Sequence, residues 1–220
     1  MTSHRAKYAA AETLCHRYRT EWGGDVKRVF EFALRAGSWR SMLPPMRPLS
    51  HPLHTPRLRL EPVTPALARA ARAGQAAFAV VIGAEAPADW CAASLPLVAR
   101  AAAHAWGPAP APTRVVAIHR EDGVVVGDVR FDPSPQMIGE VEIGYSIALS
   151  RRRQGYAVEA TGAVIDWLVA EGGAASITAG CDARNVASVR TLRRLGFWLD
   201  STPGRTFWWT LPIRQASRRA

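Results

Sequence analysis

The stretch EVEIGYSIALSRRRQGYAVEATGAVIDWLVAEGG, residues 140–173, predicts a strand, a glycine-containing turn and a helix in direct succession. Residues 140–149 are typical of a long strand. Residues 157–173 predict an amphipathic helix, because apolar side chains recur there at helical spacing, at Val164, Ile165, Leu168 and Val169. The segment between them, RRRQGYA (151–157), is compatible with a solvated charge run, a nucleic-acid contact or a loop that holds an anion.

The position of RRRQGYA at the start of a helix favours the anion loop. The first turn of a helix has unpaired N–H groups and carries a partial positive charge. Gly155 allows the backbone to approach a ligand, and Arg151, Arg152 and Arg153 add positive charge. The spacings GxxxxGK[ST] and GxGxxG are absent, so other well-known phosphate loops fit worse. Pyrophosphate is the expected occupant, and a solvated arginine-rich turn is the alternative.

Further strands and helices are expected on both sides of this stretch. The Ala-rich segment that follows the first strand predicts helices near 65–73 and 88–106. NVASVRTLRRLGF (185–197) predicts a last helix, with Asn185 as its N-cap. Alternating apolar residues and turn signals predict strands at 57–64, 113–120, 124–131, 176–182, 197–201 and 205–212. The pattern is that of a mixed α/β domain.

The first 50 residues differ in composition from the rest of the chain. SMLPPMRPLSHPLHTP, residues 41–56, holds five prolines in 16 residues and is typical of a linker. We therefore expect an N-terminal extension over 1–50 and a domain over 51–220. The extension is compatible with a partner or nucleic-acid arm, a poorly packed tail, or sequence upstream of a start at Met46.

Composition limits the classes of function without choosing one. The chain has 220 residues, 48% of them hydrophobic, enough for one sizeable core. Its net charge of +10 favours anionic partners. Cys15, Cys91 and Cys181 lie far apart, so we expect no disulfide framework and a cytoplasmic location. No metal-ligand spacing and no long apolar run occur, so neither a metal site nor a membrane span is expected.

Four segments together resemble the GNAT superfamily of acyl-CoA N-acyltransferases. The motif R-x-x-G-x-A at 152–157 is similar to that superfamily's pyrophosphate loop. TPRLRLEPVT, EVEIGYSIA, GYAVEA and NVASVRTLRRLGF look like its ribosomal-protein N-terminal acetyltransferase branch, and the resemblance covers about 55–213. It implies a twisted, mostly antiparallel sheet of six or seven strands, with helices on both faces. Two central parallel strands, 140–149 and 176–182, would be separated by a split. Arg153 stands where that branch usually has Gly.

The resemblance also implies a site for acetyl-CoA as co-substrate. The pantetheine would pair in the split with the backbone of Ile147, Ala148 and Leu149, one of whose N–H groups would polarise the thioester carbonyl. Asn185 would reach the pantetheine from the other side of the split. The pyrophosphate would be held by Arg152, Arg153, Gln154, Gly155, Tyr156 and Ala157. The Tyr156 side chain would pack beside CoA.

The implied chemistry is direct attack of an amine on the thioester. A peptide α-amine has a pKa of about 7.7–8.0, so it needs only a weak base. Glu142, on the long strand, is the candidate base, although a structurally paired carboxylate is the alternative. Ser188, one turn into the last helix, would protonate the thiolate by the same resemblance, and a capping serine is its alternative. Cys181 is expected in the core.

The expected function is therefore transfer of an acetyl group from CoA to a primary amine. The acceptor is either a protein N-terminal α-amine or a small molecule, and its loops are expected within the Ala-rich region 65–110. The protein would be a monomer or a homodimer. Two alternatives stay open: a non-catalytic acyl-CoA sensor, and a basic nucleic-acid-binding module, against which the scattered arginines argue.

Overall fold

The computed structural model describes residues 48–101, 105–106, 109–110, 112–133 and 139–213. All of them except Gly139 belong to one compact unit, which spans Met46–Pro133 and Glu140–Ala220. The predicted extension lies outside the described residues up to residue 47. Leu49 is fully buried in the core, so the folded unit already includes the residues just before position 50.

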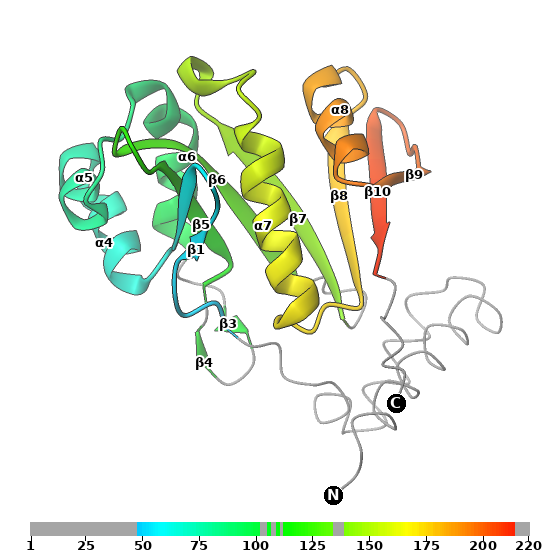
Figure 1. Ribbon diagram of the computed structural model, residues 1–220, viewed down its shortest axis with the longest axis horizontal. Coiled ribbons are helices and arrows are strands. Elements are labelled where there is room, and N and C mark those ends of the chain that lie inside the picture. The colour runs from blue at the N-terminus through cyan, green and yellow to red at the C-terminus, as the bar shows by residue number, and fades with distance from the viewer. Residues whose placement is uncertain (1–47, 102–104, 107–108, 111, 134–138, 214–220) are drawn as a thin grey trace, which may run out of the picture. The chain divides into compact units, whose positions relative to one another are not determined.

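One sheet of eight strands runs through this unit in the order β1-β2-β5-β6-β7-β8-β10-β9 (Figure 1). A separate pair is formed by β3 (Ala105–Trp106) and β4 (Ala109–Pro110). The strands of the sheet are β1 (Leu53–His54), β2 (Leu58–Pro62), β5 (Arg114–His119), β6 (Val124–Pro133), β7 (Glu140–Ile147), β8 (Ser176–Asp182), β9 (Trp198–Ser201) and β10 (Thr206–Pro212).

The predicted mixed, mostly antiparallel sheet is confirmed. Neighbouring strands pair antiparallel except β7 and β8, which are parallel. The sheet has eight strands, one more than the upper end of the predicted six or seven, because β1 was not foreseen. A two-residue strand is too short for alternation to show in a sequence, and β1 exists only through its pairing with β2.

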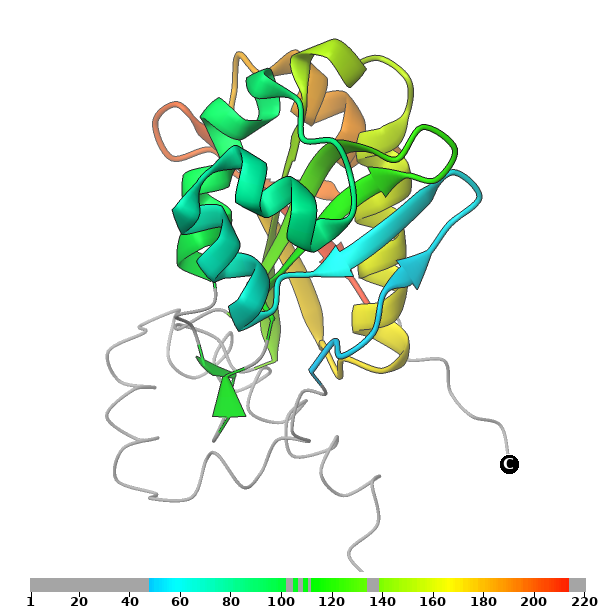
Figure 2. The ribbon, with the colours of Figure 1, turned by 90° about the vertical axis from the view of Figure 1, so that its left-hand side faces the viewer.

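Helices cover both faces of the sheet, as predicted (Figure 2). They are α4 (Pro65–Ala73), α5 (Gln75–Ile82), α6 (Ala88–Ala101), α7 (Tyr156–Ala170) and α8 (Val186–Arg194). Strand side chains alternate between the faces, so Val129 and Ile143 pack with α7, whereas Val116 and Ile118 pack with α4, α5 and α6. None of the described helices is long and apolar enough to cross a bilayer.

The helix α5 was not among the predicted elements. Its sequence, QAAFAVVI, is apolar throughout, and only Phe78 and Ile82 are buried, whereas Val80 is 82% exposed. An apolar run without helical periodicity cannot be assigned from its pattern alone. The same difficulty affected α7, where the predicted inward residue Val169 is exposed and Trp167 is buried instead.

The split predicted between the two parallel strands is confirmed. The β7–β8 ladder has three residue pairs and ends at Glu142 with Thr178. Each strand keeps its outer partner beyond that point: β6 pairs with β7 as far as Ile147, and β10 pairs with β8 as far as Asp182. The inner edges of the strands therefore diverge, as Figure 1 shows. The split is defined here as the gap between residues 143–147 of β7 and 179–182 of β8.

A chain beginning at Met46 should melt cooperatively, within about 5 °C of the full-length protein. It keeps Leu49, whose burial in the core is the reason for the expectation. Thermal melting followed by circular dichroism measures the difference. A matched chain that also carries Leu49→Ala should lose about 2–5 kcal/mol, because that change leaves a cavity in the core. Loss of soluble protein from the Met46 chain alone would show that the first 45 residues are part of the folding unit.

Candidate functional site

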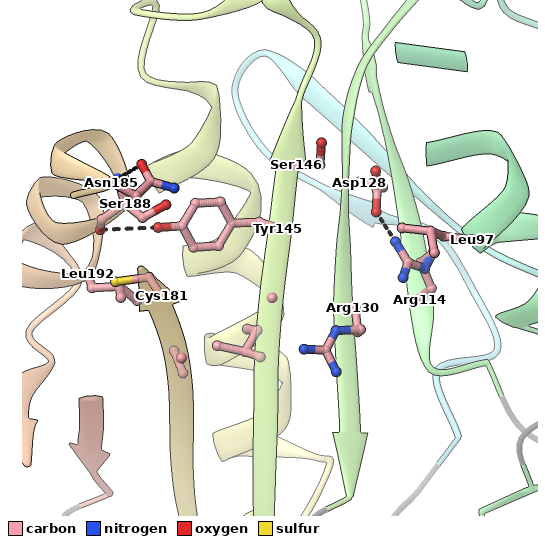
Figure 3. A pocket seen from close by; sticks show the side chains of 14 residues that line it. Leu97, Arg114, Asp128, Arg130, Tyr145, Ser146, Cys181, Asn185, Ser188 and Leu192 are labelled. Atoms are coloured by element: carbon pink, nitrogen blue, oxygen red, sulfur yellow. Dashed lines mark hydrogen bonds and ion pairs between the residues drawn. The ribbon is translucent and has the colours of Figure 1, made fainter. Parts of the chain in front are cut away.

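A pocket of about 280 Å³ occupies the split (Figure 3). It is lined from both faces of the sheet. Ile143 and Tyr145 belong to the face that packs with α7. Gly144 and Ser146 alternate with them along β7 and point to the other face. The pocket therefore has two sides, one next to α8 and one next to α6.

The α8 side of the pocket joins β7 to the start of that helix. The Tyr145 hydroxyl donates to the backbone carbonyl of Ser188 at 3.3 Å. The Ser188 N–H donates to Asn185 Oδ1 at 3.1 Å, so the predicted N-cap is confirmed. Asn185, Ser188 and Cys181 all line the pocket, which places Cys181 at the site rather than wholly in the core. Burial raises the pKa of the Tyr145 phenol, so this hydroxyl stays a hydrogen-bond donor.

The α6 side of the pocket holds a buried carboxylate that the sequence analysis missed. Asp128 is 1% exposed, pairs with Arg114 and accepts a hydrogen bond from Trp90 Nε1 at 3.0 Å. Arg114, Asp128 and Leu97 line the pocket. A signal was present: Asp128 is the one acidic residue in the apolar strand segment VVVGDVRF, and a charge buried in such a strand needs a partner. Its partners come from positions 14 and 38 residues away.

Glu142, the predicted base, lies next to the pocket and not in its wall. Its carboxylate accepts a hydrogen bond from Arg130 Nη2 at 2.6 Å. Arg130 also donates to Asp132 at 2.7 Å, and it does line the pocket. The Arg130 side chain crosses Gly144, where an added Cβ would lie 3.0 Å from its Nε. Glu142 is thus held in an ion pair on the face of the sheet that carries Asp128.

Along β7, the backbone N–H and C=O groups of alternate residues point toward the split. The Ala148 N–H donates to Val126 O at 2.9 Å, and the Ser146 carbonyl faces Gly127, so both residues point to β6. Tyr145 and Ile147 consequently point their backbone groups the other way. The Ile147 carbonyl accepts from Arg152 Nε at 3.1 Å.

The three predicted backbone contacts therefore differ in availability. The Ile147 N–H faces the split, whereas the Ala148 N–H is taken by β6. Leu149 is 63% exposed and begins a 3-10 turn, Leu149–Arg151. The backbone of Tyr145 is an additional group on the open edge that the sequence analysis did not name.

The RRRQGYA segment leads from the open end of β7 into α7. The helix begins at Tyr156, and Gly155 is its N-cap, with φ of +85°. Residues 152–155 are exposed, so the N–H groups of the first turn, which include that of Ala157, lie at the surface. The Tyr156 ring is only 5% exposed and packs in the core, and its place beside CoA stays a prediction.

The three arginines of this segment have different surroundings. Arg151 is paired with Asp122 at 2.6 Å, and this hydrogen bond lowers the pKa of the Asp122 carboxyl. Arg152 donates a hydrogen bond to the Ile147 carbonyl, as described above. Arg153 is the single non-glycine residue with positive φ among the described residues, at +63°. This left-handed conformation explains why a glycine suits the position, because it is strained for a residue with a Cβ.

Gly155 is constrained by its neighbour Arg57 as well as by its own backbone. An added Cβ would lie 3.3 Å from Arg57 Nη2, so it would point toward β2. A side chain there would thus press on Arg57. The positive φ independently disfavours any other residue.

Arg153→Gly should stabilise the protein by about 0.5–1 kcal/mol, since it removes the left-handed strain of a residue with a Cβ. The expected change is a rise in melting temperature of about 1–4 °C. Arg152→Gly is the matched control, because Arg152 has an ordinary φ of −72° and the same loss of charge. If the melting temperature of Arg153→Gly falls as far as that of Arg152→Gly, the claim that Arg153 is strained is wrong.

Comparison with known proteins gives one family over most of the folded unit. Residues 57–198 match the acetyltransferase (GNAT) domain. The uncharacterised N-acetyltransferase YjdG of Bacillus subtilis is 35% identical over 85 residues, which are 39% of this chain and 51% of that protein. The match thus spans about half the length of this curated relative.

Solved structures share the fold at low identity. An acetyltransferase of the GNAT family from Bacillus anthracis has a TM-score of 0.53 at 14% identity, covering 74% of this chain and 98% of that one. A GCN5-related N-acetyltransferase from Brucella melitensis has 0.53 at 21%, covering 77% and 82%. A provisionally assigned ribosomal-protein-serine acetyltransferase from Vibrio cholerae has 0.53 at 20%, covering 76% and 99%.

Proposed function

This chain belongs to the acetyltransferase (GNAT) domain family, and we propose that it is an acetyl-CoA-dependent N-acetyltransferase acting on a primary amine. The main support for this proposal is that a single segment contains both the open inner edge of β7 and the glycine-capped start of α7. An open strand edge can pair with amides, and a helix start can hold an anion. Acyl-CoA carries both groups in one molecule.

The residues present fit acetyl-CoA. The backbone of Tyr145 and Ile147 would hold the pantetheine on the β7 side, and the side-chain amide of Asn185, whose oxygen caps α8, would donate to it from the other side. The N–H groups from Gly155 to Ala157 would hold the pyrophosphate. Arg153 keeps the left-handed conformation that suits glycine, so the replacement preserves the path of the loop.

The two sides of the pocket would supply different proton transfers. Acetyl-CoA brings an activated thioester. The Ile147 N–H can donate to its carbonyl oxygen, and the Ser188 hydroxyl, on the α8 side, can donate a proton to the leaving sulfur. On the α6 side Glu142 can accept the proton of the amine through water, with Asp128 as a second carboxylate on the same face. Leu97, from the predicted acceptor region, borders that side.

The α6 side suits an acceptor of low pKa. Its two carboxylates already hold arginine partners, Asp128 with Arg114 and Glu142 with Arg130, and an amine that is partly neutral asks less of a base. A lysine side chain, with a pKa of about 10.4, is only roughly 0.1% neutral near pH 7.4, a cost of about 4 kcal/mol. A peptide α-amine avoids most of that cost. We therefore favour an α-amine, on a protein N-terminus or a small molecule.

The same ion pairs also support a second candidate, a non-catalytic acyl-CoA sensor. Each carboxylate has one oxygen paired with an arginine, Glu142 Oε1 with Arg130 and Asp128 Oδ2 with Arg114, and a sensor needs no base. Such a protein would bind acetyl-CoA through the same loop and turn over no amine.

Incubation with acetyl-CoA and a panel of amines, with free thiol as the readout, tests the proposal. Peptides with a free α-amine should release thiol, at a rate that levels off above about pH 8. An Nα-acetylated peptide with one lysine should react far more slowly, and its rate should still rise at pH 9. Binding of acetyl-CoA without release from any amine would establish the sensor instead.

Two glycine variants connect that result to the loop. Gly155→Val should abolish detectable acetyl-CoA binding in calorimetry while the fold survives. Gly204→Val is the matched control, because Gly204 also has positive φ, +62°, and lies far along the chain in the β9–β10 turn. Parent-like binding by Gly155→Val would remove the main support for an acyl-CoA site.

Ser188→Ala and Glu142→Gln should each lower kcat by about 10²–10⁴-fold and change acetyl-CoA affinity much less, as expected for general acid and base groups. Asp128→Asn distinguishes the two carboxylates, since the larger loss identifies the base. Glu61→Gln is the control, because Glu61 is also a strand carboxylate paired with an arginine, at 2.8 Å from Arg59. Full activity in all three site variants would leave binding and the backbone donors as the source of catalysis.

A further inference from the structure

The residue Arg57, immediately before β2, contacts the RRRQGYA segment on the side of the segment that faces β2. Its Nη1 donates to the Gln154 carbonyl at 3.0 Å, and its Nε donates to Glu159 Oε2 at 2.7 Å. Its own backbone N–H donates to Glu159 Oε1 at 2.9 Å. The guanidinium lies 4.5 Å from the centre of the Tyr156 ring. Four contacts thus connect one side chain and its backbone to both ends of the turn.

We propose that Arg57 is a positioning residue that sets the direction of the loop N–H groups before acetyl-CoA binds. This role rests on the proposed function. Arg57 does not line the pocket in the split, so it would act through the loop rather than by touching the pantetheine or the amine.

The geometry of the peptide bond connects the Gln154 contact to the loop. In a planar trans peptide, the carbonyl of one residue and the N–H of the next point in opposite directions. Arg57 holds the Gln154 carbonyl toward β2, so the Gly155 N–H must point away from β2. Without that hydrogen bond the peptide between Gln154 and Gly155 is free to rotate, because glycine tolerates many backbone conformations.

Arg57 also neutralises a charge that would oppose an anion. Glu159 lies in the first turn of α7, close to the N–H groups assigned to the pyrophosphate. Its carboxylate is turned to Arg57 and to Thr55, whose hydroxyl donates at 2.6 Å. Burial acts to raise the pKa of Glu159, but the hydrogen bonds from Thr55 and Arg57 outweigh it and leave the pKa below its ordinary value.

The ring of Tyr156 fixes the plane of the guanidinium. Tyr156 is buried, and its ring forms an edge-type contact with the His119 ring, with 5.6 Å between the centroids. A guanidinium over an aromatic face is favourable, and its planar fork can donate to two acceptors at once. A lysine at position 57 would keep the charge without the fork. The arrangement therefore predicts that Arg and Lys differ at this position in affinity for acetyl-CoA.

Calorimetric titration of Arg57→Met with acetyl-CoA tests the role. We expect a dissociation constant about 10- to 100-fold above that of the parent, the range of a lost hydrogen bond to a charged group. The KM for the amine should stay within about twofold, because the acceptor side is untouched. Arg57→Lys should weaken acetyl-CoA binding by about 10-fold. Thermal melting of each variant shows that it is folded, and Arg57→Lys carries the test if Arg57→Met does not fold.

Arg59→Met is the matched control. Arg59 lies two residues further along the chain, within β2. It forms an ion pair with Glu61 at 2.8 Å, and its side chain has a similar exposure, 34% against 43% for Arg57. It removes the same charge without touching the loop. Equal weakening of acetyl-CoA binding in Arg59→Met and Arg57→Met would reduce the effect to general electrostatics and overturn the positioning role.

The double variant Arg57→Met/Glu159→Gln separates positioning from neutralisation. If Arg57 orients the Gln154 carbonyl, removing the Glu159 charge as well leaves binding weak. Recovery to within about twofold of the parent would overturn the positioning role. Failure of the parent to bind acetyl-CoA would overturn the proposed function itself, whereas parent binding that Arg57→Met leaves unchanged would overturn only the role of Arg57.

Discussion

Three residue pairs between β7 and β8 are the constraint on which the site depends. The ladder ends at Glu142 with Thr178, while β6 and β10 continue to pair with the outer edges of the same two strands. Each strand therefore stays with its outer neighbour, while the inner edges diverge beyond Glu142 and Thr178. Backbone groups left open in this way need a partner, from water or from a ligand. The pocket, the turn and the helix start all follow from that divergence.

The order of the elements and the location of the turn could be predicted from the sequence, because they depend on local periodicity and on glycine. What depends on distant neighbours could not. Asp128 is held in the pocket wall by Trp90 and Arg114. The ion pair of Glu142 with Arg130 joins the neighbouring strands β7 and β6. β1 exists only as a partner of β2. No periodicity within one segment encodes such contacts.

The charge of the turn shows the same limit of local analysis. Three consecutive arginines suggest a uniform positive field, yet the structure gives each a separate environment. Carboxylates from other elements surround the turn: Asp122 pairs with Arg151, and Asp89 accepts from the Ser150 N–H at 2.9 Å, which lowers the pKa of Asp89. Much of the charge counted in the sequence therefore serves to hold the loop in place, and the loop backbone carries the polarity that an anion would meet.

The lining of the pocket from both sheet faces has a consequence for the order of events in a catalytic cycle. On the proposed function, the nucleotide approaches beside α8 and the amine beside α6, so neither blocks the path of the other. In the proposed direct attack the acyl group would pass from CoA to the amine with no stay on the protein, so both substrates would have to be present together. That proposal predicts sequential kinetics and not a ping-pong scheme.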